Sequence, residues 1–524
     1  MFPSKKYNLP DDKPSSEIPK LNKTNKDQQK PPLNDQLGSL DNPYFDFTSP
    51  PYQNVLKGSD FQLEDQDYKK ESPFASLRIV KDFASRSRKL KGEKIHIPSE
   101  SQKLSTIERI RMAGLLFIDS SSKVDETSNP SHPFPASTSG LSDDEAKDID
   151  LLLTLLASAD KTGQQQFEEA NELIELCSKT CSNEGTPVER LVYYFSEAIR
   201  EKINRETGRE ASGGLERMRV FDFQTAVMSV DASILAFHKK VPLSQVCQFS
   251  AINTLLEHVR RARHIHIIDL EIRSGMQYTL MMQAIASRSE WQLKHLKITA
   301  IGTRSESKIK DTCNHLAEFA QSMNIPFSYK IVMVEDMLDF NIDLLELDRH
   351  EKIAVYSSVS LSNLIVKPNR LEHLMREIRK INPCITVVSE VEANHTSLVF
   401  VNRFIDALFF YGALFDSISI CLAGDDLNRK VAESVYYDYS IRNIVAAEGD
   451  DRTIRHTGIN VWRRFFDRFG MVEIELSSES LNEAKLLIDN FNCGNCCTLR
   501  ADGRCFLVSW NGVPIFSVSA WKFI

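Results

Sequence analysis

The stretch from Arg263 to Gln283, RHIHIIDLEIRSGMQYTLMMQ, decides the fold class of this chain. A short apolar run around His266 ends at the acids Asp269 and Glu271, which is typical of a fully buried strand. Gly275 then opens a pattern of apolar residues at helical spacing. A strand with an acidic end, a glycine turn and a helix together predict the first unit of a nucleotide-binding α/β fold.

Length, charge and hydropathy narrow the class of protein. The 524 residues suffice for about three or four average domains, or for one large domain with a tail. A formal net charge of -8 argues against a protein held on DNA mainly by a basic face, because neutralised phosphates supply most of that affinity. No apolar run reaches the roughly 18 residues of a membrane span, and the N-terminus lacks the hydrophobic segment of a secretory signal. We therefore expect no membrane contact and ten reduced cysteines.

Composition divides the chain into a region 1–145 and a region 146–524. The first region is expected to be mostly disordered, because residues 1–75 are polar, rich in proline and without a sustained apolar period. Within it, one short amphipathic helix is predicted near 105–118. Such an isolated helix docks either on the chain's own core or on a partner. Upstream, a basic run fits a nuclear import signal as well as it fits a solvated charge run. Its residues are Arg86, Arg88, Lys89, Lys91 and Lys94.

The second region begins with helical periodicity. Over residues 146–260 apolar residues recur at helical spacing, and amphipathic helices are predicted over 149–161, 166–179 and 188–203. Residues 261–524 form the predicted α/β core.

Short β-rich runs alternate with helical patterns in this core. The runs are HIHIIDL, LKITAIG, FSYKIVMV, KIAVYSS and CITVVSEVE. Such alternation implies parallel strands with right-handed crossovers and helices on both faces of the sheet. The last β-rich runs are separated by DGR at 502–504 and NGV at 511–513, which are strong hairpin signals. The predicted fold class is α/β, a Rossmann-type, mostly parallel sheet with an antiparallel C-terminal hairpin, as in S-adenosylmethionine-dependent methyltransferases.

Several segments of the second region resemble motifs of the GRAS family of plant transcriptional regulators. Ile265 to Asp269 resembles the family's VHIID motif, with Ile in place of the leading Val. A family segment is resembled by the residues after the fifth predicted strand. The run RNIVAAEG resembles the PFYRE-associated segment, and the end of the chain resembles the SAW motif. The matching residues are His266, Asp269, Gly275, Glu390, Glu392, Asn394, His395, Arg442, Trp462, Trp510, Ser519, Ala520 and Trp521. Between the two acids the family has Gln, where this chain has Val391.

The resemblance implies a nuclear transcriptional regulator that acts as a co-regulator through protein contacts. It implies zinc-finger DNA-binding factors and other GRAS proteins as partners, with DNA reached mainly indirectly. The chain resembles the DELLA-like branch but lacks the DELLA and TVHYNP sequences, so hormone-triggered degradation is not implied. In the family, the leucine-rich start forms a helical cap with a pairing face. The candidates for that face are Leu151, Leu155, Leu173 and Leu176.

The alternative is a methyltransferase or a small-ligand sensor that uses the α/β cleft. A cofactor site of this fold needs several glycines after the first strand, whereas DLEIRSG supplies only Gly275. It also needs an acid after the second strand, where this chain has Thr303 and Arg304. We therefore expect a methyltransferase-like scaffold without catalysis and without a cofactor.

Other candidate sites are weaker. The chain has no G-x-S-x-G, P-loop or H-E-x-x-H pattern. Four cysteines suffice for zinc by number, but we expect them to pack as structural thiols without a metal. They are Cys493, Cys496, Cys497 and Cys505.

The charged motif residues have a structural interpretation as well. His266 is expected to be a hydrogen-bonded core histidine rather than a base. Glu390, Glu392 and Arg442 form either a buried ion-pair network or part of a small-ligand pocket, and the sequence leaves both open.

Overall fold

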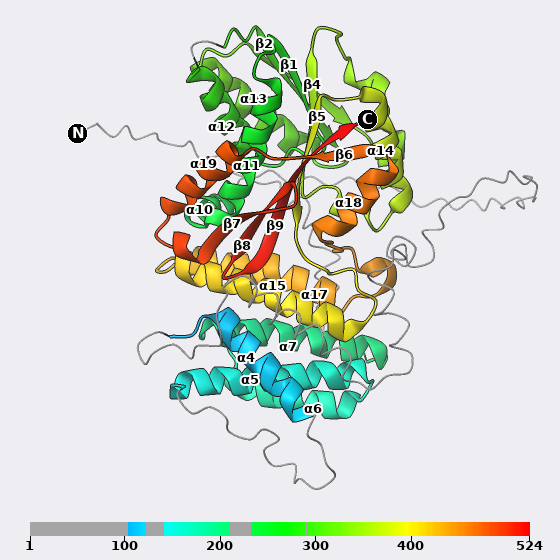
Figure 1. Cartoon of the computed structure of the whole chain (residues 1–524). Helices are drawn as coiled ribbons and strands as arrows, with labels where there is room; N and C mark the ends of the chain where they lie inside the picture. The colour runs from blue at the N-terminus through cyan, green and yellow to red at the C-terminus, as the bar shows by residue number, and fades with distance from the viewer. Residues whose placement is uncertain (1–102, 122–140, 210–231, 289–290) are drawn as a thin grey trace, which may run out of the picture. The chain divides into compact units, whose positions relative to one another are not determined.

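The computed structural model describes residues 103–121, 141–209, 232–288 and 291–524 (Figure 1). The predicted disorder of residues 1–75 and the candidate import residues lie outside these ranges. Those import residues are Arg86, Arg88, Lys89, Lys91 and Lys94.

A nine-stranded sheet forms the centre of the α/β part among the described residues. Its strand order is β3-β2-β1-β4-β5-β9-β8-β7, with β6 paired to β9. Strands β1 to β5 are parallel, and every pairing of β6 to β9 is antiparallel. The bounds are β1 (His264–Asp269), β2 (His295–Gly302), β3 (Phe327–Met333), β4 (Lys352–Ser358), β5 (Ile385–Val391), β6 (Met471–Ile474), β7 (Cys497–Asp502), β8 (Cys505–Trp510) and β9 (Val513–Phe523). The predicted Rossmann-type sheet with an antiparallel C-terminal addition is confirmed.

The strand order reverses at β1, which lies between β2 and β4. Five of the six residues of β1 are buried, because helices cover both faces of the sheet. In doubly wound folds the crevice at such a reversal, outside the carboxyl ends of the strands, is where ligands bind. Residues at the ends of β1, β4 and β5 therefore define the candidate site.

Two glycine turns join the last three strands. Gly503 between β7 and β8 has φ +58°, and Asn511 and Gly512 between β8 and β9 have φ 45° and 79°. Tight two-residue hairpins have positive φ either at both central residues, as at Asn511 and Gly512, or at the first one alone, as at Gly503. Both hairpin predictions are confirmed.

Helices pack on both faces of the sheet (Figure 1). One face packs against α11, α12, α13 and α19, and the other against α14 and α18. The sequence did not predict α18 or α19. The bounds are α10 (Ala232–Lys240), α11 (Pro242–Val259), α12 (Met276–Ala286), α13 (Glu306–Ser322), α14 (Pro368–Ile381), α18 (Ile459–Arg468) and α19 (Ser478–Asp489). Short 3-10 helices are η3 (Met337–Asp339), η4 (Ile342–Leu345), η5 (Ser362–Leu364), η7 (Gly449–Asp451) and η8 (Gly494–Cys496).

The remaining helices form a separate layer, which we call the helical layer. Its members are α4 (Thr106–Ser121), α5 (Asp143–Gly163), α6 (Phe167–Thr180), α7 (Pro187–Glu206), α15 (Phe400–Cys421), α16 (Asp426–Val431), the π-helix η6 (Ala432–Tyr437) and α17 (Asp438–Val445). The three predicted amphipathic helices correspond to α5, α6 and α7. Helix α4 packs on α5 and α15, so the isolated helix predicted near 105–118 docks on the chain's own core.

Helix α15 joins the helical layer to the sheet, since it contacts α4, α5 and α7 on one side and β8 and β9 on the other. Its most apolar window has a mean hydropathy of 1.6, so by length and composition it is apolar enough to cross a membrane. The expectation that no stretch reaches this length was therefore wrong. Within the protein, 78% of the window is buried against the neighbouring elements.

Asp416 in α15 is the polar contact between these parts. Its carboxylate accepts hydrogen bonds from the backbone N–H of Thr106 (3.2 Å), from Nε1 of Trp510 (2.8 Å) and from Nδ2 of Asn511 (2.8 Å). Arg111 of α4 in turn donates to the carbonyl oxygen of Asn511 (3.0 Å). One carboxylate therefore fastens α4, α15 and the β8–β9 turn to one another.

We predict that Asp416→Ala lowers the free energy of unfolding by about 3 kcal/mol, because two buried donors and one half-buried donor lose their acceptor together. Urea denaturation followed by circular dichroism measures this change. The exposed acid Asp467 supplies a matched control, and Asp467→Ala should change the stability by less than about 0.5 kcal/mol. Equal stability of the two variants would show that this junction is held by apolar packing alone.

Candidate functional site

Asp269 ends β1 and is fully buried. Its carboxylate accepts hydrogen bonds from the hydroxyl of Tyr278 (2.6 Å), from the backbone N–H of Glu271 (3.0 Å) and from Nε2 of Gln277 (3.5 Å). Burial raises the pKa of Asp269 to about 6. The acid holds the loop after β1 and the first turn of α12 in place.

Gly275 lies at the N-terminus of α12 with φ +69°, a conformation that favours glycine. A Cβ atom there would lie 2.8 Å from Cγ2 of Thr312 and 3.1 Å from Cδ1 of Leu316. The glycine is thus needed for the close approach of α13 to the start of α12.

The chain's own side chains bridge the crevice between β1 and β4. Arg273 donates from Nη2 to the carbonyl oxygen of Val359 (3.0 Å), and Asn363 donates from Nδ2 to Glu271 (3.3 Å). After β2, Thr303 and Arg304 are exposed where an enzyme of this fold holds the cofactor's ribose with an acid. Internal contacts therefore occupy the position of a nucleotide site.

Glu390 and Glu392 lie at the end of β5 and bind two different loops. Glu390 accepts hydrogen bonds from the backbone N–H groups of Leu361 (2.9 Å) and Ser362 (3.4 Å). Glu392 accepts from the N–H of Ile459, the first residue of α18, at 2.9 Å. Burial raises the pKa of both carboxyl groups to about 7. Each acid fixes a loop to the sheet.

Arg442 pairs with two other acids. It is in α17, where it pairs with Asp438 (2.9 Å) and with Glu201 of α7 (2.9 Å). The suggested ion-pair network of Arg442 with Glu390 and Glu392 was therefore wrong, because α17 packs within the helical layer while the two acids bind loops of the α/β part. Arg442 instead joins two helices of that layer.

A histidine pair holds the segment after β5 to the loop before α18, and Asp406 holds it to α15. Nδ1 of His395 lies 3.1 Å from Nδ1 of His456, and the backbone N–H of Asn394 donates to Asp406 of α15 (2.6 Å). Burial lowers the pKa of His395 well below its ordinary value, and it lowers that of His456 to about 4. Both imidazoles are therefore neutral at physiological pH, and one ring donates to the other.

The C-terminal motif completes the sheet. Ala520 and Trp521 of β9 pair with Val387 and Thr386 of β5, and Nε1 of Trp521 donates to Ser519 (2.9 Å). This pairing closes the parallel half of the sheet with a buried antiparallel strand.

Aromatic packing holds α18 on the same strand. The ring of Phe466 lies 4.6 Å from that of Trp521, and Trp462 stacks on Phe466 with ring centroids 5.7 Å apart. Trp510 lies on the opposite face of the sheet, where its Nε1 donates a hydrogen bond to Asp416. All three tryptophans of the motif are at most 2% exposed.

His266 is a hydrogen-bonded core histidine. Its Nδ1 lies 2.8 Å from Oε2 of Glu351, and its Nε2 lies 2.7 Å from Oγ1 of Thr299. Burial lowers the pKa of His266, so the ring is neutral, donates to Glu351 and accepts from Thr299.

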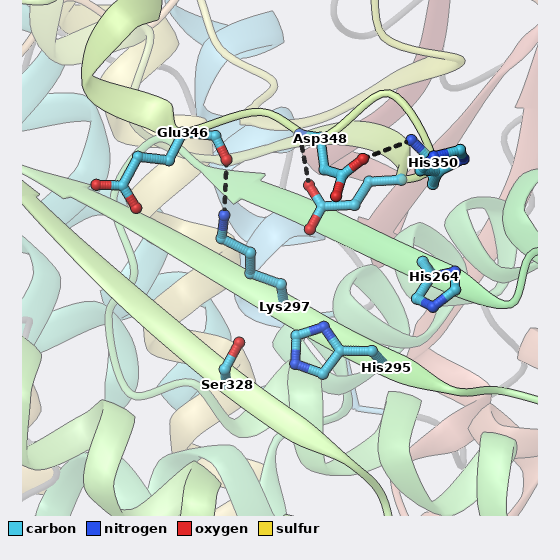
Figure 2. Close-up of a pocket in the computed structure, with 8 residues that line it drawn as sticks. His264, His295, Lys297, Ser328, Glu346, Asp348 and His350 are labelled. Carbon is cyan, nitrogen blue, oxygen red and sulfur yellow. Dashed lines mark hydrogen bonds between the residues drawn. The ribbon is translucent and has the colours of Figure 1, made fainter.

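A polar pocket of about 500 Å³ lies beside this histidine at the amino ends of the parallel strands, the edge opposite the crevice (Figure 2). Lys297 donates across it to the carbonyl oxygen of Glu346 (2.9 Å). The sequence reading missed this pocket, because its residues come from four separate segments. They are His264, His295, Lys297, Ser328, Glu346, Asp348, His350 and Glu351.

The cysteines divide between two places. Cys505 lies near Arg463, with Sγ 3.4 Å from a guanidinium nitrogen, in the core under α18. Cys493, Cys496 and Cys497 lie instead near Cys421 at the end of α15. The four-cysteine set chosen by number is therefore not one cluster. Among the described residues no group of three or more Cys, His, Asp or Glu is arranged to hold a metal ion.

The four leucine candidates for the pairing face differ in their exposure. Leu151 is 7% exposed and Leu155 is fully buried, so both were wrong as surface candidates. The reason is that α5 packs against α4, α6, α7 and α15, and therefore buries several of its sides. Leu173 is half-buried, and Leu176 is 51% exposed on α6.

The sequence pattern did not identify two charged residues of α15 that hold neighbouring elements. Asp416 has been described above. Arg403, fully buried, donates from Nε to the carbonyl oxygen of Ile444 (2.8 Å) and pairs with Glu448. The sequence did contain a signal for them, namely charged residues inside an otherwise apolar helix. Such side chains are almost never buried unless they are paired, so their presence predicts buried partners.

These features define a methyltransferase-like α/β scaffold with a bridged crevice and an attached helical layer. The sequence model of the GRAS domain family matches residues 151–522, and the chain belongs to this family. The predicted resemblance is thus confirmed.

Known relatives support the same family. The DELLA protein GAI1 of Vitis vinifera is 26% identical over 386 residues, covering 73% of this chain and 63% of that protein. DELLA protein 2 of Medicago truncatula is 29% identical over 385 residues, covering 72% and 68%. The chain thus spans less than two-thirds of the length of the first of these relatives. The crystal structure of SCL7 in Oryza sativa has the same fold, with a TM-score of 0.61 and 23% identity over 71% of this chain and 99% of that one.

We predict that Glu390→Gln reduces the loss of stability between pH 5.5 and pH 8. The folded-state pKa of Glu390 is about 7 against an ordinary value of 4.5, so the group's contribution is complete below pH 4.5 and is lost as pH rises through 7. The full loss for one such group is about 3 kcal/mol. Glutamine keeps an oxygen for the two backbone donors but does not ionise. Thermal unfolding across this pH range measures the difference.

The exposed acid Glu475 provides the control, since Glu475→Gln should follow the unmodified chain at every pH. Parallel pH profiles of the Glu390→Gln variant and the unmodified chain would contradict the assignment.

Proposed function

We propose that this chain is a plant transcriptional regulator that acts in the nucleus as a co-regulator, through contacts with DNA-binding factors and other GRAS proteins. Membership of the GRAS domain family over residues 151–522 is the observation that carries the proposal. The bridged crevice supports it, because Arg273 and Asn363 use the ligand edge of the sheet for internal contacts. A methyltransferase function is not favoured on the same grounds. A small-ligand sensor using that crevice is likewise less well supported.

The proposed domain organisation follows the sequence, with one refinement. We assign residues 1–145 to an N-terminal region and 146–524 to the GRAS-like domain, with 146–260 as its helical part and 261–524 as its α/β core. Helix α4 lies before this boundary but packs in the same core. A stable fragment should therefore include it and begin before Leu104.

The pairing surface in this proposal is the outer face of α6. Leu176 is 51% exposed there, and Leu173 lies one turn before it. Glu172 and Lys179 are exposed around this pair. An apolar centre with a charged rim is the usual anatomy of a protein interface. The occupant that we propose is the matching face of another GRAS protein, as a homodimer or heterodimer.

DNA is reached indirectly in this proposal. The chain carries a net charge of -8, which opposes tight binding to phosphates by the isolated protein. A zinc-finger factor supplies the base contacts, and this chain supplies the regulatory contacts.

We predict that Leu176→Asp breaks self-association and leaves the unfolding transition within about 1 kcal/mol of the unmodified chain, because this side chain is exposed. The matched variant Leu155→Asp places a charge in the core and should unfold the helical layer. Analytical ultracentrifugation and denaturation measure the two properties separately. A dimer that persists in the folded Leu176→Asp variant would exclude the α6 face.

We also predict that the isolated chain retains promoter DNA weakly and without sequence preference at physiological salt, and that a zinc-finger partner restores specific retention. Gel-shift titrations of one promoter fragment and of a scrambled fragment, each with and without partner, make the comparison. Specific nanomolar binding by the chain alone would defeat the co-regulator proposal.

A further inference from the structure

Two cysteines that are distant in sequence meet where the helical layer joins the sheet. Cys421 is the last residue of α15, and Cys493 immediately precedes η8. Their Sγ atoms lie 2.7 Å apart although the residues are 72 positions apart in the chain. Both are free thiols. Because a disulfide bond is about 2.0 Å long, a movement of less than about 1 Å separates the pair from a covalent link.

Both partners are held in place by their surroundings. Cys421 ends a long buried helix. The loop of Cys493 is tight, since Gly494 donates its N–H to the carbonyl oxygen of Phe491 (2.9 Å). A Cβ atom on Gly494 would lie 2.4 Å from the carbonyl oxygen of Ile488, so the loop sits directly on the end of α19. The sulfur contact is thus set by two fixed elements rather than by a mobile terminus.

We propose that Cys421 and Cys493 form a reversible intrachain disulfide when the chain meets hydrogen peroxide. In the first step the sulfur of Cys421 attacks one peroxide oxygen, the O–O bond breaks, and water leaves with the thiol proton. In the second step the sulfur of Cys493 attacks the resulting sulfenic sulfur, the S–O bond breaks and a second water leaves. Two thiols and one peroxide thus yield one disulfide and two waters. A dithiol reductant reverses the change.

The two thiols differ in their exposure. Cys421 is half-buried, whereas Cys493 is 6% exposed, so Cys421 is the thiol that an oxidant reaches first. Burial also raises the pKa of the Cys421 thiol, so the thiolate fraction is small and the reaction with peroxide is slow.

The link would have a structural consequence. Asp416, which binds Trp510, lies on the same end of α15 as Cys421. Joining this end to the loop before β7 would therefore fasten the helical layer to the sheet covalently. The inference does not depend on the proposed regulatory function.

Peptide mapping of the full chain tests the inference. After treatment with peroxide and alkylation of the remaining thiols, trypsin releases Cys421 in the peptide 404–429 and Cys493 in the peptide 486–500. We expect the two peptides to be linked without reductant and separate after dithiothreitol. Fragmentation of the linked pair should place the bond at Cys493 rather than at Cys496 or Cys497.

Two variants make the result decisive. Cys421→Ser should abolish the link, whereas Cys384→Ser should retain it, because Cys384 is a half-buried thiol with no such partner at the start of β5. Circular dichroism checks that both are folded, and Cys493→Ser replaces Cys421→Ser if the latter is not. Separate peptides after peroxide, or a bond to Cys496 or Cys497, would overturn the inference. So would zinc that copurifies with the chain and is lost in Cys421→Ser.

Discussion

The buried carboxylate of Asp269 is the interaction on which the α/β part depends. It accepts hydrogen bonds from the backbone of Glu271 and from the hydroxyl of Tyr278, so it fixes both the loop after β1 and the start of α12. A buried carboxylate is tolerated only when its oxygens are satisfied, and therefore the loop and the acid constrain each other. With the loop fixed, Arg273 reaches the loop after β4 and bridges the crevice of the sheet.

Buried charged groups with specific partners also hold the junction between the sheet and the helical layer. Helix α15 is apolar enough to be buried on nearly all sides, yet it carries Asp416 and Arg403 at positions where each has specific partners. Glu433 of the π-helix η6 is likewise buried between Arg190 (2.9 Å) and Arg429 (3.0 Å). Removing one member of such a set leaves a buried charge, which costs far more than the set contributes to stability. These contacts specify how the two parts join, while apolar packing supplies most of the stability.

The sequence predicted those features that local patterns encode. The five apolar runs form strands β1 to β5, and the turns at Gly503 and Gly512 form hairpins. Both features depend on residues that are neighbours in the sequence, so local patterns suffice to predict them. Features set by distant contacts were missed or wrong. The partners of Arg442 lie in α7 and α17, and Cys421 approaches Cys493 only in the folded chain. The prediction of a pairing face for the leucines of α5 was wrong for a related reason. Periodicity shows which side of a helix is apolar, but it does not show how many sides other elements cover.

This scaffold uses the ligand edge of a nucleotide-binding sheet for internal contacts, and in the proposed function its outer surfaces bind other proteins. Isothermal titration calorimetry of the full chain with S-adenosylmethionine tests this claim most directly. The account predicts no heat of binding, because Arg273 and Asn363 bridge the crevice. A saturable binding isotherm would contradict it.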